Sequence, residues 1–230
     1  MLPFAELLGE EFSQRQPDIA VDVQGGGSTA GIQALANGIT DIGTCSRSLN
    51  ADEERGFNAI VIARDGLAVV VHPGNPVSDL KREQIRDLFS GRIRNWNEVG
   101  GRDGPIWLIT REEGSGTREA FMKLVMGGQR ICRRALVQES NGAVKELVRS
   151  DPAAIGYMSL GLVHGELKAL SVGGVPPTGE QVLAGRYPVV RPFLFVVRDK
   201  PTGRVRQFID FTLSAEGQRL LAAEGLVQAR

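Results

Sequence analysis

The sequence TREEGSGTR, residues 110–118, decides the fold. A short apolar run, residues 105–109, comes before it, and an amphipathic pattern with Ala120, Phe121, Leu124 and Val125 on one helical face comes after it. This order predicts a strand, a glycine-rich turn and a helix, as in an α/β protein.

The same stretch carries chemistry that suits a small tetrahedral anion. Glycine lets the backbone approach a ligand closely, so the N–H of Gly116 is a candidate donor. Ser115 and Thr117 offer hydroxyl donors, and Arg111 offers a planar fork for an oxyanion. An ordinary turn followed by a helix cap would have the same letters, so this stretch alone leaves both interpretations open.

Two further loops have the same design. The sequence QGGGSTAG, residues 24–31, leads into a helical pattern and places Ser28 at the helix start. The sequence DIGTCSRS, residues 41–48, ends a short strand and contributes Ser46 and Arg47. Because ligands of open α/β sheets bind beyond the carboxyl ends of the strands, we expect the three loops to share one site.

Composition excludes several other classes of protein. Lys+Arg and Asp+Glu both number 27, so the chain lacks the basic excess of a typical nucleic-acid binder. Cys45, Cys132, His72 and His164 show no metal-ligand spacing, and the sequence predicts neither a metal site nor a cofactor. No apolar run reaches the roughly 20 residues that a membrane-spanning helix needs, and no signal peptide opens the sequence.

The order of apolar segments predicts two lobes with mostly parallel sheets flanked by helices and a ligand cleft between the lobes. A helix is expected over 2–14 and a strand over 19–23. Apolar crossings near 59–71 and 189–197 divide the chain into lobe I, 1–71 plus 192–230, and lobe II, 72–191. The hinge crossings are expected near 67–73 and 188–193.

The chain resembles the substrate-binding proteins of the bacterial ABC-type phosphate uptake system, which have the type II periplasmic-binding-protein fold. The resemblance runs from Leu2 to about Val227. It rests on GGGSTAG (25–31), LFSGRIRNW (88–96) and REEGSGT (111–117), with weaker support from AIGY (154–157) and YPVVRP (187–192).

The resemblance implies a function and a set of ligand-binding residues. It implies binding of inorganic phosphate in the periplasm or another extracytoplasmic space, for delivery to a membrane-embedded ABC transporter permease, with no catalysis. The implied phosphate contacts come from one lobe through Ser28 and from the other through Arg111, Ser115, Gly116 and Thr117.

Two departures from the family pattern keep alternatives open. Ser46, followed by Arg47, stands where the best-known members have a carboxylate that rejects sulfate, so sulfate, molybdate or tungstate are alternative ligands. We include both residues among the expected contacts. The family's first strand and first anion-binding loop have no counterpart before Leu2, so we expect a truncated start or a chain–chain contact at the edge of the sheet.

Two other functions are weaker alternatives. A phosphate-ester-processing enzyme would need a nucleophile with a base or a cluster of metal-binding carboxylates. Glu112 and Glu113 have no such partners at a recognisable spacing, and Cys45 has no neighbouring histidine. A ligand-sensing domain of a transcription factor would need a helix-turn-helix segment, and neither end of the sequence fits one.

Overall fold

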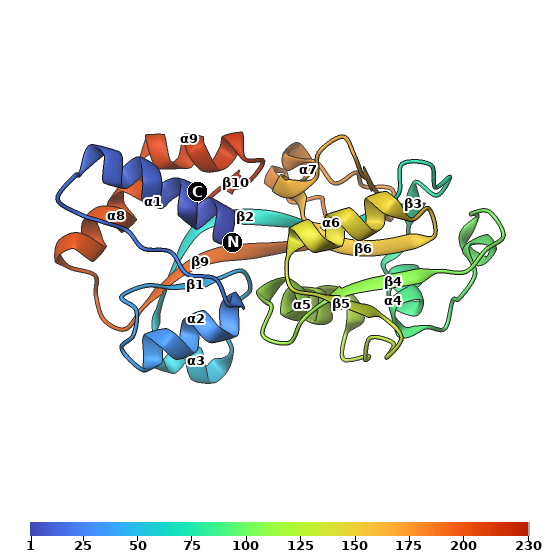
Figure 1. Cartoon of the computed structure of the whole chain (residues 1–230), viewed down its shortest axis with the longest axis horizontal. Helices are drawn as coiled ribbons and strands as arrows, with labels where there is room; N and C mark the ends of the chain where they lie inside the picture. The colour runs from blue at the N-terminus through green and yellow to red at the C-terminus, as the bar shows by residue number, and fades with distance from the viewer. Residues whose placement is uncertain (230) are drawn as a thin grey trace. The chain divides into compact units, whose positions relative to one another are not determined.

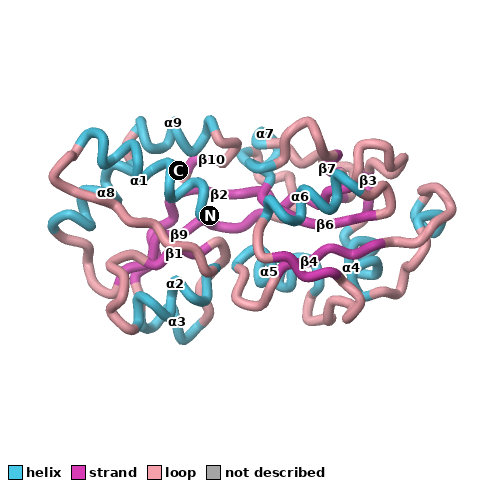
Figure 2. Tube along the Cα trace, viewed as in Figure 1, coloured by secondary structure: helices cyan, strands magenta, loops and turns pink. Residues whose placement is uncertain are grey.

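The computed structural model describes residues 1–229, and the chain divides into two compact units. The first unit comprises Met1–Arg64, Gly114–Gly116 and Arg191–Arg230, and the second comprises Asp65–Glu113 and Thr117–Val190. Both units combine strands with flanking helices (Figures 1 and 2), which confirms the α/β class. The lobe and hinge boundaries inferred from the sequence stay a prediction.

The first unit packs helices on both sides of short strands (Figure 1). Its helices are α1 (Leu2–Arg15), α2 (Gly27–Ala36), α3 (Ala51–Gly56), α8 (Gly203–Leu213) and α9 (Ala215–Ala223). Its strands are β1 (Gly43–Cys45), the first half of β2 (Asn58–Val71), β9 (Val190–Val197) and β10 (Val227–Gln228). Strand β1 pairs antiparallel with β9, and β10 pairs antiparallel with β2.

Helix α1 forms because its apolar residues recur at helical spacing. Phe4, Leu8 and Phe12 lie on one buried face. The ring of Phe12 packs edge-on against that of Phe208 in α8, with centroids 5.3 Å apart. This contact fixes α1 against α8. The bounds of α1 confirm the helix expected over 2–14.

The strand expected over 19–23 does not form. No residue of this segment belongs to a strand. The Val21 N–H instead donates to Ser13 Oγ at 3.3 Å, and the Val21 side chain packs close to Gly9 of α1. An alternating pattern makes a strand only where a neighbouring strand completes its hydrogen bonds, so this prediction was wrong.

The second unit contains a mixed sheet in the order β2-β6-β4-β5, with α6 and α7 on one face and α4 and α5 on the other (Figure 1). Its strands after β2 are β3 (Asp79–Leu80), β4 (Trp107–Arg111), β5 (Leu136–Gln138), β6 (Ala154–Ser159), β7 (Lys168–Ala169) and β8 (Ser171–Val172). Its α-helices are α4 (Arg82–Ser90), α5 (Gly116–Phe121, which begins in the first unit), α6 (Asn141–Ser150) and α7 (Gly179–Leu183). Single turns of other helix types are η1 (Trp96–Val99), η2 (Met122–Met126) and η3 (Leu160–Leu162).

Fewer strand pairs are parallel than the alternation of strands and helices suggests. Strand β4 pairs parallel with β5 and β6, and β3 pairs parallel with β8. The long strand β2 pairs antiparallel with β6, β7 and β10. The sheet of the second unit is therefore mixed: β4 makes parallel pairs and β2 makes antiparallel pairs.

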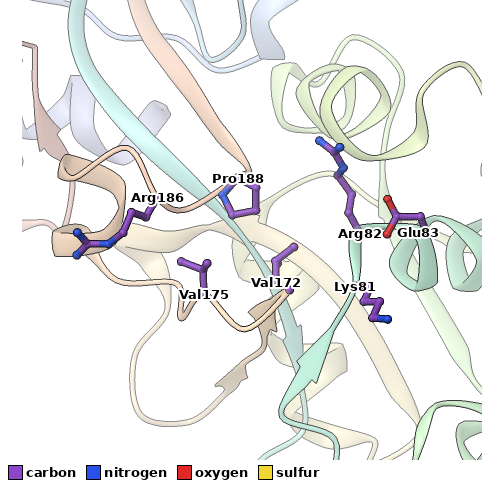
Figure 3. A pocket seen from close by; sticks show the side chains of 8 residues that line it. Lys81, Arg82, Glu83, Val172, Val175, Arg186 and Pro188 are labelled. Atoms are coloured by element: carbon purple, nitrogen blue, oxygen red, sulfur yellow. The ribbon is translucent and has the colours of Figure 1, made fainter.

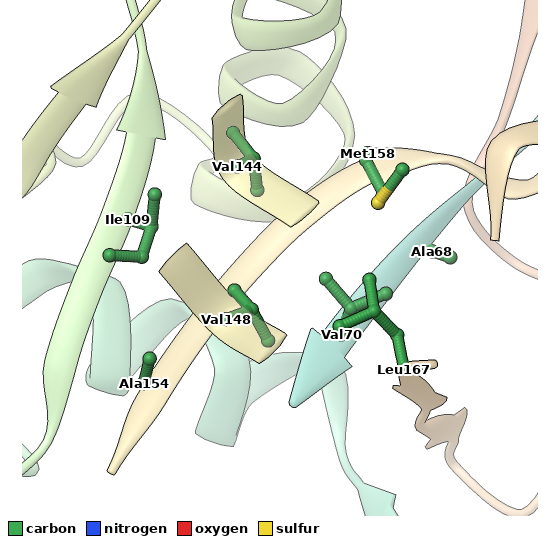
Figure 4. Close-up of a cluster of buried hydrophobic side chains, with 8 residues drawn as sticks. All are labelled: Ala68, Val70, Ile109, Val144, Val148, Ala154, Met158 and Leu167. Carbon is green, nitrogen blue, oxygen red and sulfur yellow. The ribbon is translucent and has the colours of Figure 1, made fainter. Parts of the chain in front are cut away.

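A cluster of small and branched side chains holds α6 onto the second unit's sheet. Val144 and Val148 of α6 point toward Ile109 of β4 and Met158 of β6 (Figure 4). All four are fully or almost fully buried. Removing such side chains costs about 2–5 kcal/mol each for large-to-small changes, so this packing fixes the strand that ends at Arg111.

Candidate functional site

All seven residues expected to bind the anion are buried. Because these residues are shielded from solvent, their polar groups need hydrogen-bond partners other than bulk water. Five lie in the first unit and two in the second. They are Ser28, Ser46, Arg47, Ser115 and Gly116 in the first unit, and Arg111 and Thr117 in the second.

Three of them meet in the first unit. The Ser46 N–H donates to Ser28 Oγ at 3.0 Å, and the two hydroxyl oxygens are 3.4 Å apart. A Cβ atom built on Gly116 would collide with both hydroxyls, so the Gly116 backbone lies directly against them. The structure therefore brings together residues from all three loops that the sequence singled out.

Local geometry explains why these loops need glycine. Gly27, the first residue of α2, has φ +85°, a backbone conformation that costs other residues energy. A Cβ there would lie 2.7 Å from the Gly114 carbonyl oxygen. The Thr29 N–H donates to that same oxygen at 3.2 Å, which fixes the 114–116 segment against the start of α2.

The hydroxyl of Ser28 keeps a hydrogen that it can donate. A serine oxygen has one hydrogen to give and two lone pairs to receive. The Ser46 N–H takes one lone pair, which leaves the hydrogen for Ser46 Oγ or for an anion. Ser28 also lies in the first turn of a ten-residue helix, where the helix dipole favours negative charge.

Arg47 is engaged by a partner that the sequence analysis missed. Its guanidinium forms a two-pronged ion pair with Glu53, at 2.7 and 2.8 Å, and also donates to the Ser48 carbonyl. Glu53 in addition accepts from the Asn50 N–H in the capping box of α3. The structure thus places the Arg47 guanidinium on Glu53, and its contact with an anion stays a prediction.

The ion pair lowers the pKa of Glu53. Hydrogen bonds from Arg47 are the main reason that the pKa of Glu53 lies below its usual value. A lowered carboxyl pKa stabilises the fold above the group's ordinary pKa. That contribution disappears as the pH falls through the lowered value. Near neutral pH the pair is therefore intact.

Arg111 is held by a second two-pronged ion pair. Its Nε and Nη2 donate to Glu112 at 2.9 Å each, and Nη1 donates to Asn141 Oδ1 at 3.4 Å. Backbone carbonyls of Gln138 and Glu139 accept further bonds from the same guanidinium. The fork is fixed in one orientation at the end of β4, and the sequence analysis missed Glu112 as its partner.

The backbone at Arg111 is fixed from the other side by a buried tyrosine. Tyr157 Oη lies 2.7 Å from Thr110 Oγ1 and accepts from the Arg111 N–H at 3.4 Å. Its ring stacks on Phe121 with centroids 3.9 Å apart. Burial raises the pKa of Tyr157, so it stays a neutral hydroxyl in the physiological range.

A separate cavity of about 330 Å³ lies in the second unit and does not have the features of an anion site. Val172, Val175 and Pro188 form its apolar part (Figure 3). The charged end of Arg186 points away from Val175 and Pro188 (Figure 3). Because its cationic groups do not converge, this cavity is not our candidate site.

Within residues 1–229 no cluster of three or more His, Cys, Asp or Glu side chains has the arrangement of a metal site. None of the helices in that part of the chain is long and apolar enough to cross a membrane.

Comparison with known proteins gives the family. The model of the PBP superfamily domain matches residues 1–216. Phosphate-binding protein PstS of Bacillus subtilis is 30% identical over 230 residues, covering 97% of this chain and 76% of the relative. Phosphate-binding protein PstS of Borreliella burgdorferi is 31% identical over 222 residues, covering 91% of this chain and 79% of the relative.

Solved structures agree with this relationship. A Clostridium perfringens protein, named as a phosphate ABC transporter substrate-binding protein and crystallised with bound phosphate, has a TM-score of 0.95 and 39% identity. The alignment covers 100% of this chain and 96% of that one. An ABC-type phosphate transport receptor from Vibrio cholerae has a TM-score of 0.86 and 36% identity, with coverage of 99% and 96%. The chain belongs to the PBP superfamily and, within it, to the family of PstS phosphate-binding proteins.

Proposed function

We propose that this protein binds inorganic phosphate outside the cytoplasm and delivers it to a membrane-embedded ABC transporter permease. The observation that carries the proposal is the convergence of Ser28, Ser46 and Gly116, in a member of a family whose named relatives bind phosphate. That family membership supports the proposed transport partner and location.

The chemistry of the seven residues suits a desolvated oxyanion. Removing a dianion from water is costly unless hydrogen bonds replace its hydration shell. Serine and threonine hydroxyls and a close-packed glycine N–H supply short donors, and Arg111 supplies positive charge. We propose that Ser28, Ser46, Ser115, Gly116, Thr117 and Arg111 make these contacts, with Arg47 adding charge beside them.

A second candidate is another tetrahedral oxyanion, such as sulfate, molybdate or tungstate. It is favoured by Ser46, a neutral hydroxyl that can donate to an anion lacking a proton as readily as it can accept from hydrogen phosphate. The carboxylate of Glu53, which lies in the following helix α3, is committed to Arg47. Nothing in the proposal requires conversion of the ligand, so we propose a binding protein and not an enzyme.

Thermal unfolding in the presence of each anion tests the proposal. A ligand that binds only the folded state stabilises it by about 2.7 kcal/mol at a concentration 100 times its dissociation constant. We expect phosphate to raise the melting temperature at micromolar concentration and sulfate to need far more. A larger shift with sulfate, molybdate or tungstate would reassign the ligand. Release of product from a chromogenic phosphate ester would overturn the non-enzymatic assignment.

A further inference from the structure

A fully buried arginine of the first unit holds the backbone of Ser46. Arg191 lies in β9 and is 1% exposed. Its Nη1 donates to the Ser46 carbonyl at 3.3 Å. Its guanidinium also lies over the ring of Phe193, 5.1 Å from the centroid. Arg191 is not among the residues expected to contact phosphate.

The bond to Ser46 completes a clamp on a single residue. Ser46 follows the last residue of β1, where the chain leaves the sheet. Its N–H donates to Ser28 Oγ, and its carbonyl accepts from Arg191. Because the N–H and the carbonyl of Ser46 are both hydrogen-bonded, its backbone is fixed, and the hydroxyl reaches a ligand from a fixed position. The hydrogen bond from the Ser46 N–H also orients the Ser28 hydroxyl, because it occupies one lone pair of Ser28 Oγ.

The choice of arginine over an apolar residue calls for an explanation. Burying a charge is costly, and well-packed apolar residues often replace buried charges at no loss of stability. Neighbouring inward-facing positions of β9, Phe193 and Phe195, are apolar. The hydrogen bond to the Ser46 carbonyl is a contact that an apolar residue at this position could not make.

We infer that Arg191 is a positioning residue for phosphate binding: it fixes the Ser46 backbone, from which the Ser46 hydroxyl reaches the ligand. This inference rests on the proposed function of the same site. It adds a residue that contributes to binding through Ser46.

Arg198 provides a matched control. It lies just beyond the end of β9 and also donates from its guanidinium to a backbone carbonyl, that of Leu35 at 2.8 Å. Leu35 lies in the last turn of α2, away from the helix start that carries Ser28. Loss of Arg198 removes a comparable hydrogen bond without touching the clamp on Ser46.

The experiment compares Arg191→Met, Arg191→Lys and Arg198→Met in the full chain by titration with inorganic phosphate. We expect Arg191→Met to weaken binding by about 10- to 100-fold. Arg191→Lys keeps a donor but not the planar fork, and its affinity is expected to fall between those of wild type and Arg191→Met. Arg198→Met is expected to bind as wild type does.

The amide resonance of Ser46 supplies a readout that does not depend on ligand. We expect Arg191→Lys to shift that resonance and speed its hydrogen exchange, and Arg198→Met to leave both unchanged. If Arg191→Met does not fold, Arg191→Lys carries the test. An unchanged Ser46 resonance together with wild-type affinity in Arg191→Lys would overturn the inference. Failure of wild type to bind phosphate would instead overturn the proposed function, while the Ser46 resonance would still report on the clamp.

Discussion

Replacing Gly116 with alanine is expected to lower phosphate affinity by at least about 100-fold while leaving the protein folded. A Cβ atom at this position would lie 2.5 Å from Ser46 Oγ, 2.9 Å from Ser28 Cβ and closer still to Ser28 Oγ. Both hydroxyls would have to leave their present positions. Each lost hydrogen bond to a charged ligand is worth about 1.5–3 kcal/mol. The new methyl group would also occupy space beside them.

Gly56→Ala is the matched control for this substitution. A Cβ at Gly56 meets no atom within 4 Å, and Gly56 ends α3 in the same unit without a positive φ. Its affinity should equal that of wild type. Titration calorimetry on both variants, with circular dichroism as a check on folding, makes the comparison. Wild-type affinity in a folded Gly116→Ala protein would show that the two hydroxyls do not hold the ligand.

Replacing Arg111 with methionine is expected to reduce phosphate affinity by a similar factor, about 100-fold or more. The substitution removes a buried positive charge and a fork fixed by Glu112 and Asn141. Arg111→Lys, which keeps the charge but not the fork, should lose about tenfold. Removing one partner of a fully buried ion pair destabilises a fold by about 3–5 kcal/mol, and the loss here should be smaller because the Glu112 side chain is 27% exposed.

Two further variants separate binding from stability. Arg111→Met combined with Glu112→Gln removes the unpaired carboxylate, so part of the stability should return while binding stays weak. Arg149→Met removes an exposed arginine whose ion pair with Glu146 contributes little, and phosphate should bind it normally. Recovery of binding along with stability in the double variant would mean that Arg111 supports the fold and does not touch the ligand.

The loops of the site were predictable because their chemistry is local. Glycine, serine and strand–helix order place Ser28 and Gly116 at helix starts and Ser46 at a strand end, and topology brings such segments together at strand ends. The helix over 2–14 was predictable for the same reason, since Phe4, Leu8 and Phe12 recur at every fourth residue.

The ion pairs were harder to foresee because they depend on geometry beyond the motif. Glu53 pairs with Arg47 from six residues downstream, although Asn50 and Glu53 have the spacing of a capping box and could have drawn attention to α3. Glu112 carried no spacing signal, since neighbouring residues pair only when the backbone turns one toward the other. Arg191 did carry a signal, a charged residue inside an apolar strand, which the sequence analysis used only as part of a motif.

The strand expected over 19–23 failed for a different physical reason. Alternation records which side chains face the core, but a strand also needs hydrogen bonds from a neighbour. Similarly, the alternation of strands and helices predicted more parallel pairing than the sheet has, because pattern alone does not give the direction of a strand's partner.

Isothermal titration of the protein with phosphate, alone and in the presence of excess sulfate, tests the central claim most directly. The account predicts one phosphate per chain, bound at micromolar or lower concentration, with little change when sulfate is present. Binding that Ser28→Ala and Ser46→Ala both weaken would place the ligand at the hydroxyls that meet Gly116. No heat of binding with phosphate, or displacement of phosphate by sulfate at equal concentration, would contradict the account.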